Sequence, residues 1–283
     1  MISRRALLAT SACSLLPVRG DELFGDAEAY EKFMGRWSRQ MAAPLVDFAS
    51  IGQSGRILDV GSGTGALAFA IAARNPACEL VGIDPSKEYV AYASSRNKFG
   101  KRVRFEVGDA QQLPFPAASF DHSASLLVWN FIPDPMKALR EVARVTKPGG
   151  RIAAAVWDYG AGMRMLRVFW DAVVATDPAA DSHDEKHMAL CRAGELAELW
   201  KKAGLAQVEE HPLQVTLRFQ SFADYWDPFL LGQGPAGAYV RQLDRPRAEK
   251  LRTEAKRRLG VKDESSRIDL EARVWAVRGT TQK

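Results

Sequence analysis

The sequence predicts an α/β protein with a doubly wound, mainly parallel sheet, and three features of the chain lead to that prediction. Short apolar runs alternate with amphipathic stretches from residue 56 onward, which is the pattern of strands joined by crossover helices. The first apolar run, Arg56–Val60, leads directly into the glycine-rich turn Gly61–Gly65, and a helix-forming stretch begins at Ala66. Acidic or polar residues follow the later apolar runs, as expected where parallel strands end at a ligand site.

The composition limits the class of protein. The chain has 283 residues, of which 47% are hydrophobic and 26% charged, and its net charge is +5; these values are ordinary for a globular protein. The dense basic run over residues 250–258 has helical spacing and is typical of a solvated helix face, so nucleic acid is not favoured as a partner. The cysteines, Cys13, Cys78 and Cys191, are far apart, which favours a reducing compartment without a structural disulfide.

The first twenty residues combine a twin arginine, Arg4-Arg5, with a short apolar stretch from Ala6 to Leu16. An export signal has this form. However, the stretch is too short to span a bilayer, and no small-x-small cleavage site follows it. We therefore predict a disordered N-terminal extension on a cytoplasmic protein without stable membrane insertion, with an export signal as the alternative.

The acid that precedes the glycine-rich turn narrows the choice of cofactor. Gly61, Gly63 and Ala66 also fit a loose dinucleotide fingerprint, but a dinucleotide places a doubly charged pyrophosphate against this turn. The Asp59 carboxylate would repel that group unless it pointed away. S-Adenosylmethionine carries a cationic sulfonium and an ammonium instead, which a carboxylate attracts. Residues 56–65 resemble the first motif of the class I S-adenosylmethionine-dependent methyltransferases, an apolar strand with Asp or Glu before Gly-x-Gly-x-Gly; a dinucleotide remains the alternative.

The resemblance covers residues 36–278, is strongest over 56–157, and includes the small-molecule pattern of the type-11 methyltransferases of quinone biosynthesis. It implies a Rossmann-like sheet of seven strands, the last of them antiparallel, with helical lid insertions. We predict one domain over residues 21–283. Its core is expected at 51–158, 192–220 and 265–279, and its lid segments at 21–50, 159–191 and 221–262.

Cofactor-binding residues are expected at the carboxyl ends of the strands. Asp84 ends the second strand, 79–84, where its carboxylate can accept hydrogen bonds from both ribose hydroxyls. The resemblance places Asp109 and Ala110, after the third strand, against the adenine amino group and a ring nitrogen. The expected cofactor-binding set is Arg36, Asp59, Gly61, Ser62, Gly63, Gly65, Asp84, Pro85, Asp109, Ala110 and Leu126.

Large apolar residues recur along one side of a predicted helix within residues 21–50. Core packing would explain this spacing. The resemblance implies a second role, in which the helix lies over the cofactor and Tyr30, Arg36 or Trp37 reaches the methionine end. There the Arg36 guanidinium would pair with the cofactor carboxylate.

The fourth and fifth strands, Phe120 to about Val128 and Arg151–Trp157, are expected to end beside the methyl acceptor. Residues 128–131 do not match the Asn/Asp-Pro-Pro-Tyr of enzymes that methylate base amines or glutamine, so those substrates are disfavoured. The candidate catalytic residues are Trp129 and Trp157, as sulfonium contacts, and Asp158, as a general base if one is needed; a structural role for Asp158 is equally open.

Polar residues elsewhere are interpreted as structural. Asp121 and His122 lie at the other end of the fourth strand, and Asp134-Pro135 predicts the start of a helix that ends at Val145. His183 and His187 have i,i+4 spacing but no further ligand cluster, so no metal is expected. The remaining elements are expected to be a helix rich in Met and aromatic residues after residue 160, a helix at 194–203, a strand at 208–219, helices within 221–260 and a strand at 268–277.

The expected function is methyl transfer to a small acceptor of apolar character, at O or C rather than N, by in-line displacement. Alignment in a dry pocket, rather than a protein nucleophile, would supply the catalysis. N-methylation of a small amine or amino acid is one alternative. A regulatory protein that binds S-adenosylmethionine without turnover is another.

Overall fold

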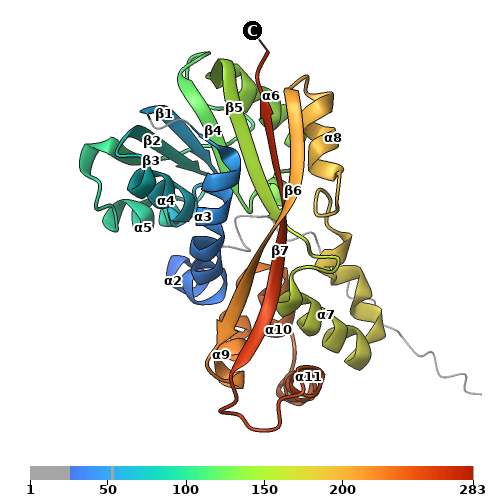
Figure 1. Cartoon of the computed structure of the whole chain (residues 1–283). Helices are drawn as coiled ribbons and strands as arrows, with labels where there is room; N and C mark the ends of the chain where they lie inside the picture. Colours follow the sequence, from blue (N-terminus) through green and yellow to red (C-terminus); the bar gives the residue numbers. More distant parts are fainter. Residues whose placement is uncertain (1–25, 52–53, 283) are drawn as a thin grey trace, which may run out of the picture.

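The computed structural model describes residues 26–51 and 54–282, so the predictions for residues 1–20 lie outside the described part of the chain. Its centre is a seven-stranded sheet in the order β3-β2-β1-β4-β5-β7-β6 (Figure 1). All neighbours pair in parallel except β7, which is antiparallel to both β5 and β6. The predicted sheet, with its last strand inserted antiparallel, is confirmed. The strands are β1 (Ser54–Val60), β2 (Ala77–Asp84), β3 (Val103–Val107), β4 (Phe120–Leu126), β5 (Thr146–Trp157), β6 (Ala206–Phe219) and β7 (Ile268–Thr280).

Helices cover both faces of this sheet, as the apolar strands require. In Figure 1, α3, α4 and α5 lie in front of the sheet and α6 and α8 behind it. The helix predicted from Met136 begins at Pro135, and the Asp134 side chain accepts a hydrogen bond from the Lys137 amide, which confirms the predicted cap. The five helices are α3 (Arg36–Ala49), α4 (Ala66–Arg74), α5 (Lys87–Ser95), α6 (Pro135–Val145) and α8 (Glu195–Lys202).

Several strand boundaries differ from the sequence prediction, and the differences in β4 and β5 have a clear cause. β4 ends at Leu126 rather than near Val128, because Leu127 adopts a positive φ of 65° and the chain turns into the short helix η3 (Trp129–Phe131). β5 begins at Thr146 rather than Arg151, because Thr146 pairs with Phe120 across an irregularity in the ladder. Residues 146–150, which lie between the predicted helix and the predicted strand, are thus part of β5.

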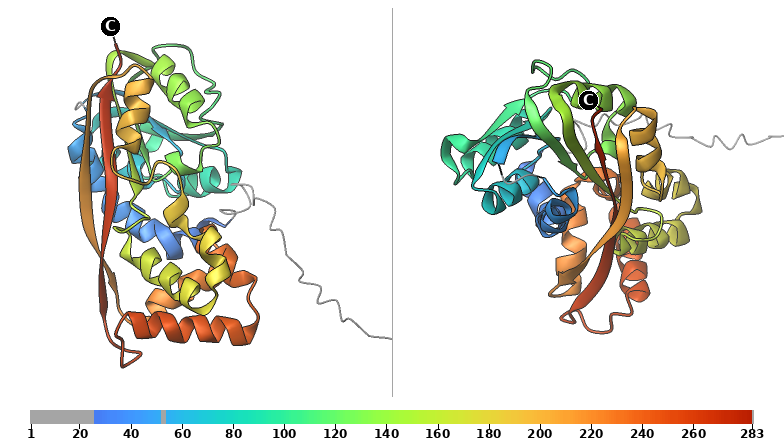
Figure 2. Two further views of the ribbon diagram at one scale, coloured as in Figure 1. Left: turned by 90° about the vertical axis from the view of Figure 1, so that its right-hand side faces the viewer. Right: turned by 45° about the horizontal axis from the view of Figure 1, so that its top comes forward.

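The β6–β7 pair extends beyond the rest of the sheet. β5 pairs with β7 only over residues 274–280, whereas β6 stays paired with β7 as far as Ile268. The result is a two-stranded arm, formed by residues 214–219 and 268–273. Figures 1 and 2 show helices gathered around this arm, with α11 lying across its far end. These helices are α7 (Arg164–Thr176), α9 (Phe222–Trp226), α10 (Gly234–Arg241) and α11 (Arg245–Arg258).

An aromatic cluster joins the arm helices to the N-terminal helices. The Phe169 ring of α7 stacks on Phe229, with centroids 4.4 Å apart, and Phe33 meets Phe229 edge-on at 5.3 Å. Trp37 packs edge-on against Phe219 at 5.0 Å. Phe33 belongs to η1 (Glu31–Gly35), a π-helical turn between α2 (Ala27–Tyr30) and α3. The three lid segments predicted from the sequence therefore meet in one buried cluster, where each large ring contributes about 1.5–3 kcal/mol of burial.

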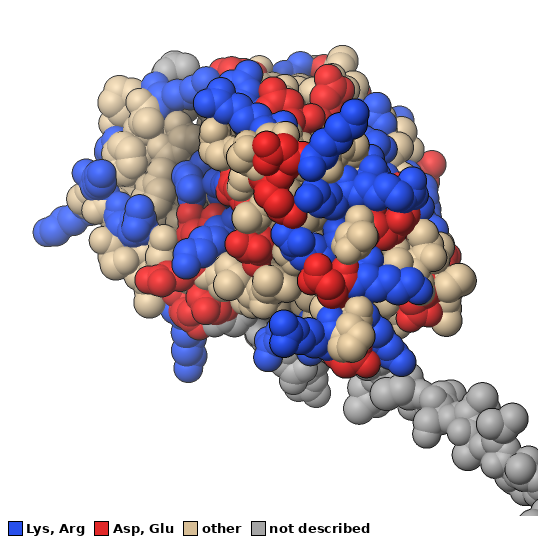
Figure 3. Space-filling model, turned by 90° about the horizontal axis from the view of Figure 1, so that it is seen from below, with Lys and Arg blue, Asp and Glu red and all other residues tan. Residues whose placement is uncertain are grey.

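The surface below the arm is mixed in charge. Figure 3 shows acidic residues interleaved with the lysines and arginines on this face. On α11, Glu254 pairs with Arg257 and Arg258, while Arg252 and Lys256 pair with Glu264. The basic run at 250–258 is therefore a solvated helix face, as predicted.

Within residues 26–51 and 54–282, no helix has the length and apolar character needed to cross a membrane.

Candidate cofactor and acceptor site

The glycine-rich turn is held against β2 by its own backbone. The amides of Gly61 and Ser62 both donate to the Ile83 carbonyl, at 2.8 and 3.0 Å. Gly61 has a φ of +67°, and a Cβ there would lie 2.5 Å from Val128 Cγ2. Gly63 has a φ of +51°, but a Cβ there would meet nothing within 4 Å. The first glycine is thus required by close packing, whereas the second opens onto free space at the tip of β1.

Asp84, at the tip of β2, connects this turn to the next helix. One carboxylate oxygen accepts the Gly63 amide and the other the Ser86 amide, both at 2.9 Å. Burial raises the pKa of Asp84, and these two hydrogen bonds oppose the rise. Each oxygen can accept a second hydrogen bond, so the geometry leaves Asp84 available to ribose hydroxyls.

Asp59 is fully buried beneath the turn. Its Oδ2 accepts the Ala68 amide of α4 at 3.0 Å, while Oδ1 has no hydrogen-bond partner among the described residues. Burial raises the pKa of Asp59 to about 7, the Ala68 hydrogen bond opposes the rise, and the nearby Asp84 adds to it. A cationic group beside Oδ1 would satisfy this oxygen.

A small closed cavity lies above these residues. Its volume is about 20 Å³, enough for a water molecule, whereas ligand pockets run from about 300 to 1,000 Å³. A nucleoside-sized cofactor can therefore enter only if the covering residues move. The cavity is lined by Tyr30, Ser38, Asp59, Gly61, Ser62, Gly63, Thr64, Ala66, Leu67 and Leu126.

The cover over this cavity is the N-terminal lid segment. The Tyr30 hydroxyl lies 3.1 Å from Ser38 Oγ, and the Tyr30 ring packs against Tyr89 with centroids 5.3 Å apart. Glu31 accepts a hydrogen bond from the Thr64 hydroxyl of the glycine-rich turn at 2.5 Å. The Ala27 amide donates to Glu88 on α5. These contacts hold the N-terminal helices against the glycine-rich turn and α5.

The residues around the cavity fit S-adenosylmethionine. Asp59 Oδ1 and the Ser62 hydroxyl have no hydrogen-bond partner among the described residues, so both could bind polar groups of the cofactor. A Cβ added at Gly63 would meet nothing within 4 Å, so a ligand could approach the backbone there. Three of the lining residues were not singled out from the sequence, namely Ser38, Thr64 and Leu67, and Ala66 was named only for the dinucleotide fingerprint. Thr64 lies within the recognised motif, so its position there was the available signal.

Three other predicted cofactor residues lie at strand ends but outside the lining of the closed cavity. Asp109 is exposed after β3, and its carboxylate accepts the Gln111 amide at 2.8 Å. Ala110 is half-buried, and Pro85 is exposed after β2. Gly65, with a φ of +90°, precedes α4 and supplies the turn into that helix. Adenine binding by Asp109 and Ala110 stays a prediction.

Arg36 lies between the lid segments. Its guanidinium donates to the Asp224 carboxylate at 2.7 Å and to the Asp224 carbonyl at 3.0 Å, and it stacks over Trp37 with 4.2 Å to the ring centroid. Arg36 thus joins α3 to α9 in the closed form. Its pairing with the cofactor carboxylate stays a prediction.

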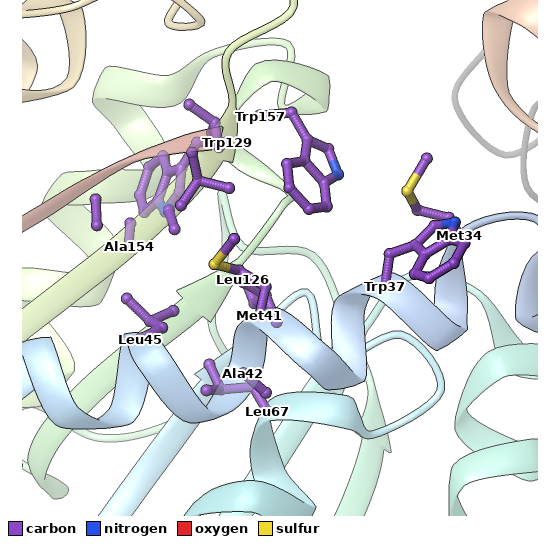
Figure 4. Close-up of a cluster of buried hydrophobic side chains, with 14 of the residues drawn as sticks. Met34, Trp37, Met41, Ala42, Leu45, Leu67, Leu126, Trp129, Ala154 and Trp157 are labelled. Carbon is purple, nitrogen blue, oxygen red and sulfur yellow. The ribbon is translucent and has the colours of Figure 1, made fainter. Parts of the chain in front are cut away.

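The predicted catalytic residues are all buried at the carboxyl ends of β4 and β5. The Trp129 indole donates to Ser125 Oγ, and the ring packs edge-on against Trp200. Figure 4 shows the Trp157 nitrogen turned away from Trp129, toward the side of Met34 and Trp37. That nitrogen has no hydrogen-bond partner among the described residues.

The carboxylate of Asp158 is already engaged. Arg273 of β7 donates to Oδ2 through Nε at 2.9 Å and Nη2 at 2.5 Å, and the Ala161 amide donates to Oδ1. This pairing connects the end of β5 to the β6–β7 arm. It favours the structural role of Asp158, and its role as a base stays a prediction.

The residues interpreted as structural have structural contacts. Asp121 accepts the Arg56 amide and pairs with Lys147, and His122 Nδ1 accepts the Arg151 amide within the sheet. His187 lies 3.2 Å from Asp181 Oδ2. Among the described residues, no group of three or more His, Cys, Asp or Glu side chains is arranged to hold a metal ion.

The fold and the residues around the cavity match those expected of a class I, S-adenosylmethionine-dependent methyltransferase. A family model described as a methyltransferase domain matches residues 58–154. That segment, which contains the glycine-rich turn and strands β2 to β4, is a type-11 methyltransferase domain.

Individual relatives match over the same part of the chain. The uncharacterized methyltransferase YcgJ of Bacillus subtilis is 43% identical over 98 residues, 34% of this chain and 38% of that protein. A demethylmenaquinone methyltransferase of Thermus thermophilus is 39% identical over 118 residues, 41% of this chain and 52% of that protein. A 27-O-demethylrifamycin SV methyltransferase of Amycolatopsis mediterranei is 40% identical over 101 residues, 35% of this chain and 37% of that protein.

The matched segments thus span about half or less of these relatives. The crystal structure of YcgJ superimposes with a TM-score of 0.57 at 23% identity, covering 88% of this chain and 99% of that one. The similarity in fold therefore extends well beyond the matched sequence.

Proposed function

We propose that this protein transfers a methyl group from S-adenosylmethionine to the oxygen or carbon of a small-molecule acceptor. The observation that carries the proposal is the polar cavity at the tips of β1 and β2. There the glycine-rich turn, the buried Asp59 with one unpaired oxygen, and Asp84 converge beneath a closed lid.

The chain's own groups have distinct tasks in this proposal. Asp84 would bind the ribose hydroxyls, Asp59 and Ser62 would face the polar methionine end, and Asp109 would accept from the adenine amine. When bound, S-adenosylmethionine supplies an electrophilic methyl group on a cationic sulfur. The lid excludes water, and the fixed geometry aligns donor and acceptor, an effect worth up to roughly 7–11 kcal/mol in well-oriented cases.

An aromatic acceptor that carries a hydroxyl group suits the apolar side chains of the lid segments. Buried aromatic rings from η1, α3, α7 and the β6–β7 arm pack against one another there, which favours an apolar ring system. Two of the relatives are named for substrates with oxygenated rings, demethylmenaquinone and demethylrifamycin. We therefore propose a phenol or hydroquinone as the acceptor class.

Calorimetry with S-adenosylhomocysteine tests the cofactor assignment. We expect binding to the wild-type protein and about a 10- to 100-fold weaker affinity in Asp84→Ala, corresponding to the 1.5–3 kcal/mol of a hydrogen bond to a charged group. Asp121→Ala, at the opposite end of the sheet, is the matched control and should bind like the wild type. Binding of NAD in place of S-adenosylhomocysteine would contradict the proposal.

A transfer assay tests the acceptor class. Radiolabelled S-adenosylmethionine and 1,4-naphthoquinol, kept reduced with dithionite, should give a labelled product extractable into organic solvent. Tight cofactor binding with no product from naphthoquinol or from a panel of phenols would favour the non-catalytic alternative over an enzyme acting on hydroxylated rings.

A further inference from the structure

The N-terminal lid segment borders the space in which the cofactor is expected to bind. The cavity between the lid and the glycine-rich turn has a volume of about 20 Å³, whereas pockets that hold small ligands measure about 300 to 1,000 Å³. Tyr30 lines this cavity from the lid. Gly63 lines it from the turn and donates its amide to Asp84 at 2.9 Å. Tyr30 therefore lies next to the proposed ribose site.

Two hydrogen bonds fix the start of the lid on this site. The Thr64 hydroxyl of the glycine-rich turn donates to the Glu31 carboxylate at 2.5 Å. At the first residue of α2, the Ala27 amide donates to Glu88 at 3.0 Å, and α2 lies beside α5 (Figure 1). Residues 27–31 are thus attached both to the turn that follows β1 and to the helix that follows β2.

A buried hydroxyl next to the lid lacks a hydrogen-bond partner among the described residues. It belongs to Tyr89 of α5, which is 5% exposed and whose ring lies 5.3 Å from the Tyr30 ring between centroids. Ser86 connects Tyr89 to Asp84, because its hydroxyl accepts the Tyr89 amide at 3.3 Å and its own amide donates to Asp84 at 2.9 Å. Burying an unpaired hydroxyl is costly, so this position suits a polar ligand better than it suits the Tyr30 ring.

A change of helix type separates residues 27–31 from α3. The π-helical turn η1 spans Glu31–Gly35, and such turns are frequent at functional sites. A Cβ on Gly35 would lie 2.5 Å from Glu31 Oε1, so glycine is needed for the Glu31 carboxylate to take its position. Immediately after this turn, Arg36 donates to Asp224 at 2.7 Å. The break in regular helix allows residues 27–31 to move while Arg36 keeps α3 in place.

We propose that residues 27–31 and S-adenosylmethionine compete for the same space beside Asp84, so that the lid inhibits cofactor binding while Glu31 accepts the Thr64 hydrogen bond. This inference rests on the proposed function, because S-adenosylmethionine is the ligand that displaces the segment. The apparent affinity is then the intrinsic affinity multiplied by the fraction of molecules in which residues 27–31 have left the site. A lid that folded over the bound cofactor would instead add to the affinity.

Hydrogen exchange measured by mass spectrometry tests the competition on the wild-type protein. At saturating S-adenosylhomocysteine, residues 27–31 should exchange faster than in the free protein, because the Ala27 amide loses its acceptor on Glu88. The exchange of α3 should not change, since Arg36 still holds that helix. Slower exchange of residues 27–31 with S-adenosylhomocysteine would overturn the inference, because it would show that the segment closes over the ligand.

Calorimetry on lid variants gives a second, independent readout. Glu31→Ala removes the acceptor of the Thr64 hydroxyl, so S-adenosylhomocysteine should bind about 3- to 10-fold more tightly than to the wild type. Glu88→Ala releases the other end of the segment from an exposed position and should also tighten binding. Glu28→Ala is the matched control, because it removes an exposed acid of α2 that takes part in neither hydrogen bond. Its affinity should match the wild type.

The melting temperature of each variant shows whether it is folded at the temperature of the titration. Weaker or unchanged binding in folded Glu31→Ala and Glu88→Ala would overturn the inference while leaving the cofactor assignment intact. Binding to these two variants but not to the wild type would be the strongest support for it. Absence of S-adenosylhomocysteine binding in the wild type and in every variant would instead contradict the proposed function itself.

Discussion

The cofactor side and the acceptor side of this molecule are built in different ways. On the cofactor side, the contacts join neighbouring stretches of one segment: Gly63 to Asp84, 21 residues apart, and Ala68 to Asp59, nine apart. Most of them involve backbone amides. On the acceptor side, side chains join distant parts of the chain, as in Arg36 with Asp224, 188 residues apart, and Arg273 with Asp158, 115 apart.

The cofactor side and the acceptor side therefore depend on the amino-acid sequence in different ways. A backbone-built site tolerates any sequence that keeps the turn geometry and one or two acids, whereas a site built from distant side chains can be re-formed for a new ligand by changing the lid. The comparison predicts that substitutions on the cofactor side affect folding and cofactor binding together. Substitutions in the lid should change acceptor chemistry with little effect on the sheet.

Replacing Gly61 and Gly63 of the turn one at a time tests the cofactor side most severely. In Gly61→Ala the methyl group would lie 2.5 Å from Val128 Cγ2 in a left-handed backbone conformation. Left-handed strain and overpacking together should cost roughly 2–5 kcal/mol of unfolding free energy, measurable by urea denaturation. Gly63→Ala is the matched control, because its methyl group meets open space.

Gly63→Ala is expected to lose only about 1–2 kcal/mol of stability, which is the cost of placing alanine in a left-handed backbone conformation. Its new methyl group projects over the cofactor cavity, so affinity for S-adenosylhomocysteine should fall more than stability does. Equal destabilisation of the two variants would show that Val128 moves aside easily, and the distinction between packing and ligand-facing glycines would not hold.

Much of the cofactor side could be predicted from the sequence, because its information is local. The apolar run ending at Val60, the three glycines and the acid at Asp84 specify a strand, a turn and a strand tip at fixed spacing, and the sheet order then places them together. The cap at Asp134 follows the same logic, whereas the antiparallel last strand was implied by the resemblance to the methyltransferase family.

The acceptor side could not be predicted in this way. Nothing local to Glu185 indicates that its carboxylate would accept a hydrogen bond from the Trp170 indole; this contact exists only once η5 (Glu185–His187) packs against α7. Likewise, Arg36 was expected to face the cofactor, and its partner Asp224 could not be identified without the arm. Long-range side-chain pairs leave no periodic pattern in the chain.

The buried acid beneath the turn should make stability depend on pH. Because the pKa of Asp59 is raised from 3.8 to about 7, the folded state keeps a proton that the unfolded state releases between these values. Stability is thus fully present below about pH 4 and falls as the pH rises toward 7, by about 1.4 kcal/mol per pH unit. Urea unfolding at pH 5, 6 and 7 should show this slope.

Asp59→Asn should flatten that slope, since an asparagine oxygen can still accept the Ala68 amide but binds no proton. The difference in slope would amount to about 2–3 kcal/mol between pH 5 and pH 7. The pKa of Glu185 is also raised to about 7, so Glu185→Gln should likewise reduce the loss of stability with rising pH. The unfolding free energy of the double variant should therefore depend less on pH than that of either single variant. An unchanged slope in Asp59→Asn would mean that Asp59 is ionised in the folded state.

The smallest effect concerns the Arg36–Asp224 pair, which joins two lid segments at partly exposed positions. If Arg36 only anchors α3 to α9, then Arg36→Ala and Asp224→Ala should each lower stability by a similar amount. Their double-mutant cycle should give a coupling energy of about 1 kcal/mol. Both variants should also bind S-adenosylhomocysteine with similarly small losses.

The alternative role of Arg36 predicts a different pattern in the same two variants. If its guanidinium leaves Asp224 to pair with the cofactor carboxylate when the lid closes on ligand, Arg36→Ala should weaken S-adenosylhomocysteine binding by about tenfold or more. Asp224→Ala should then leave the affinity unchanged or tighten it, because it frees Arg36 from its competitor. Calorimetry on this pair therefore decides whether Arg36 belongs to the acceptor-side lid alone or to both sides of the site.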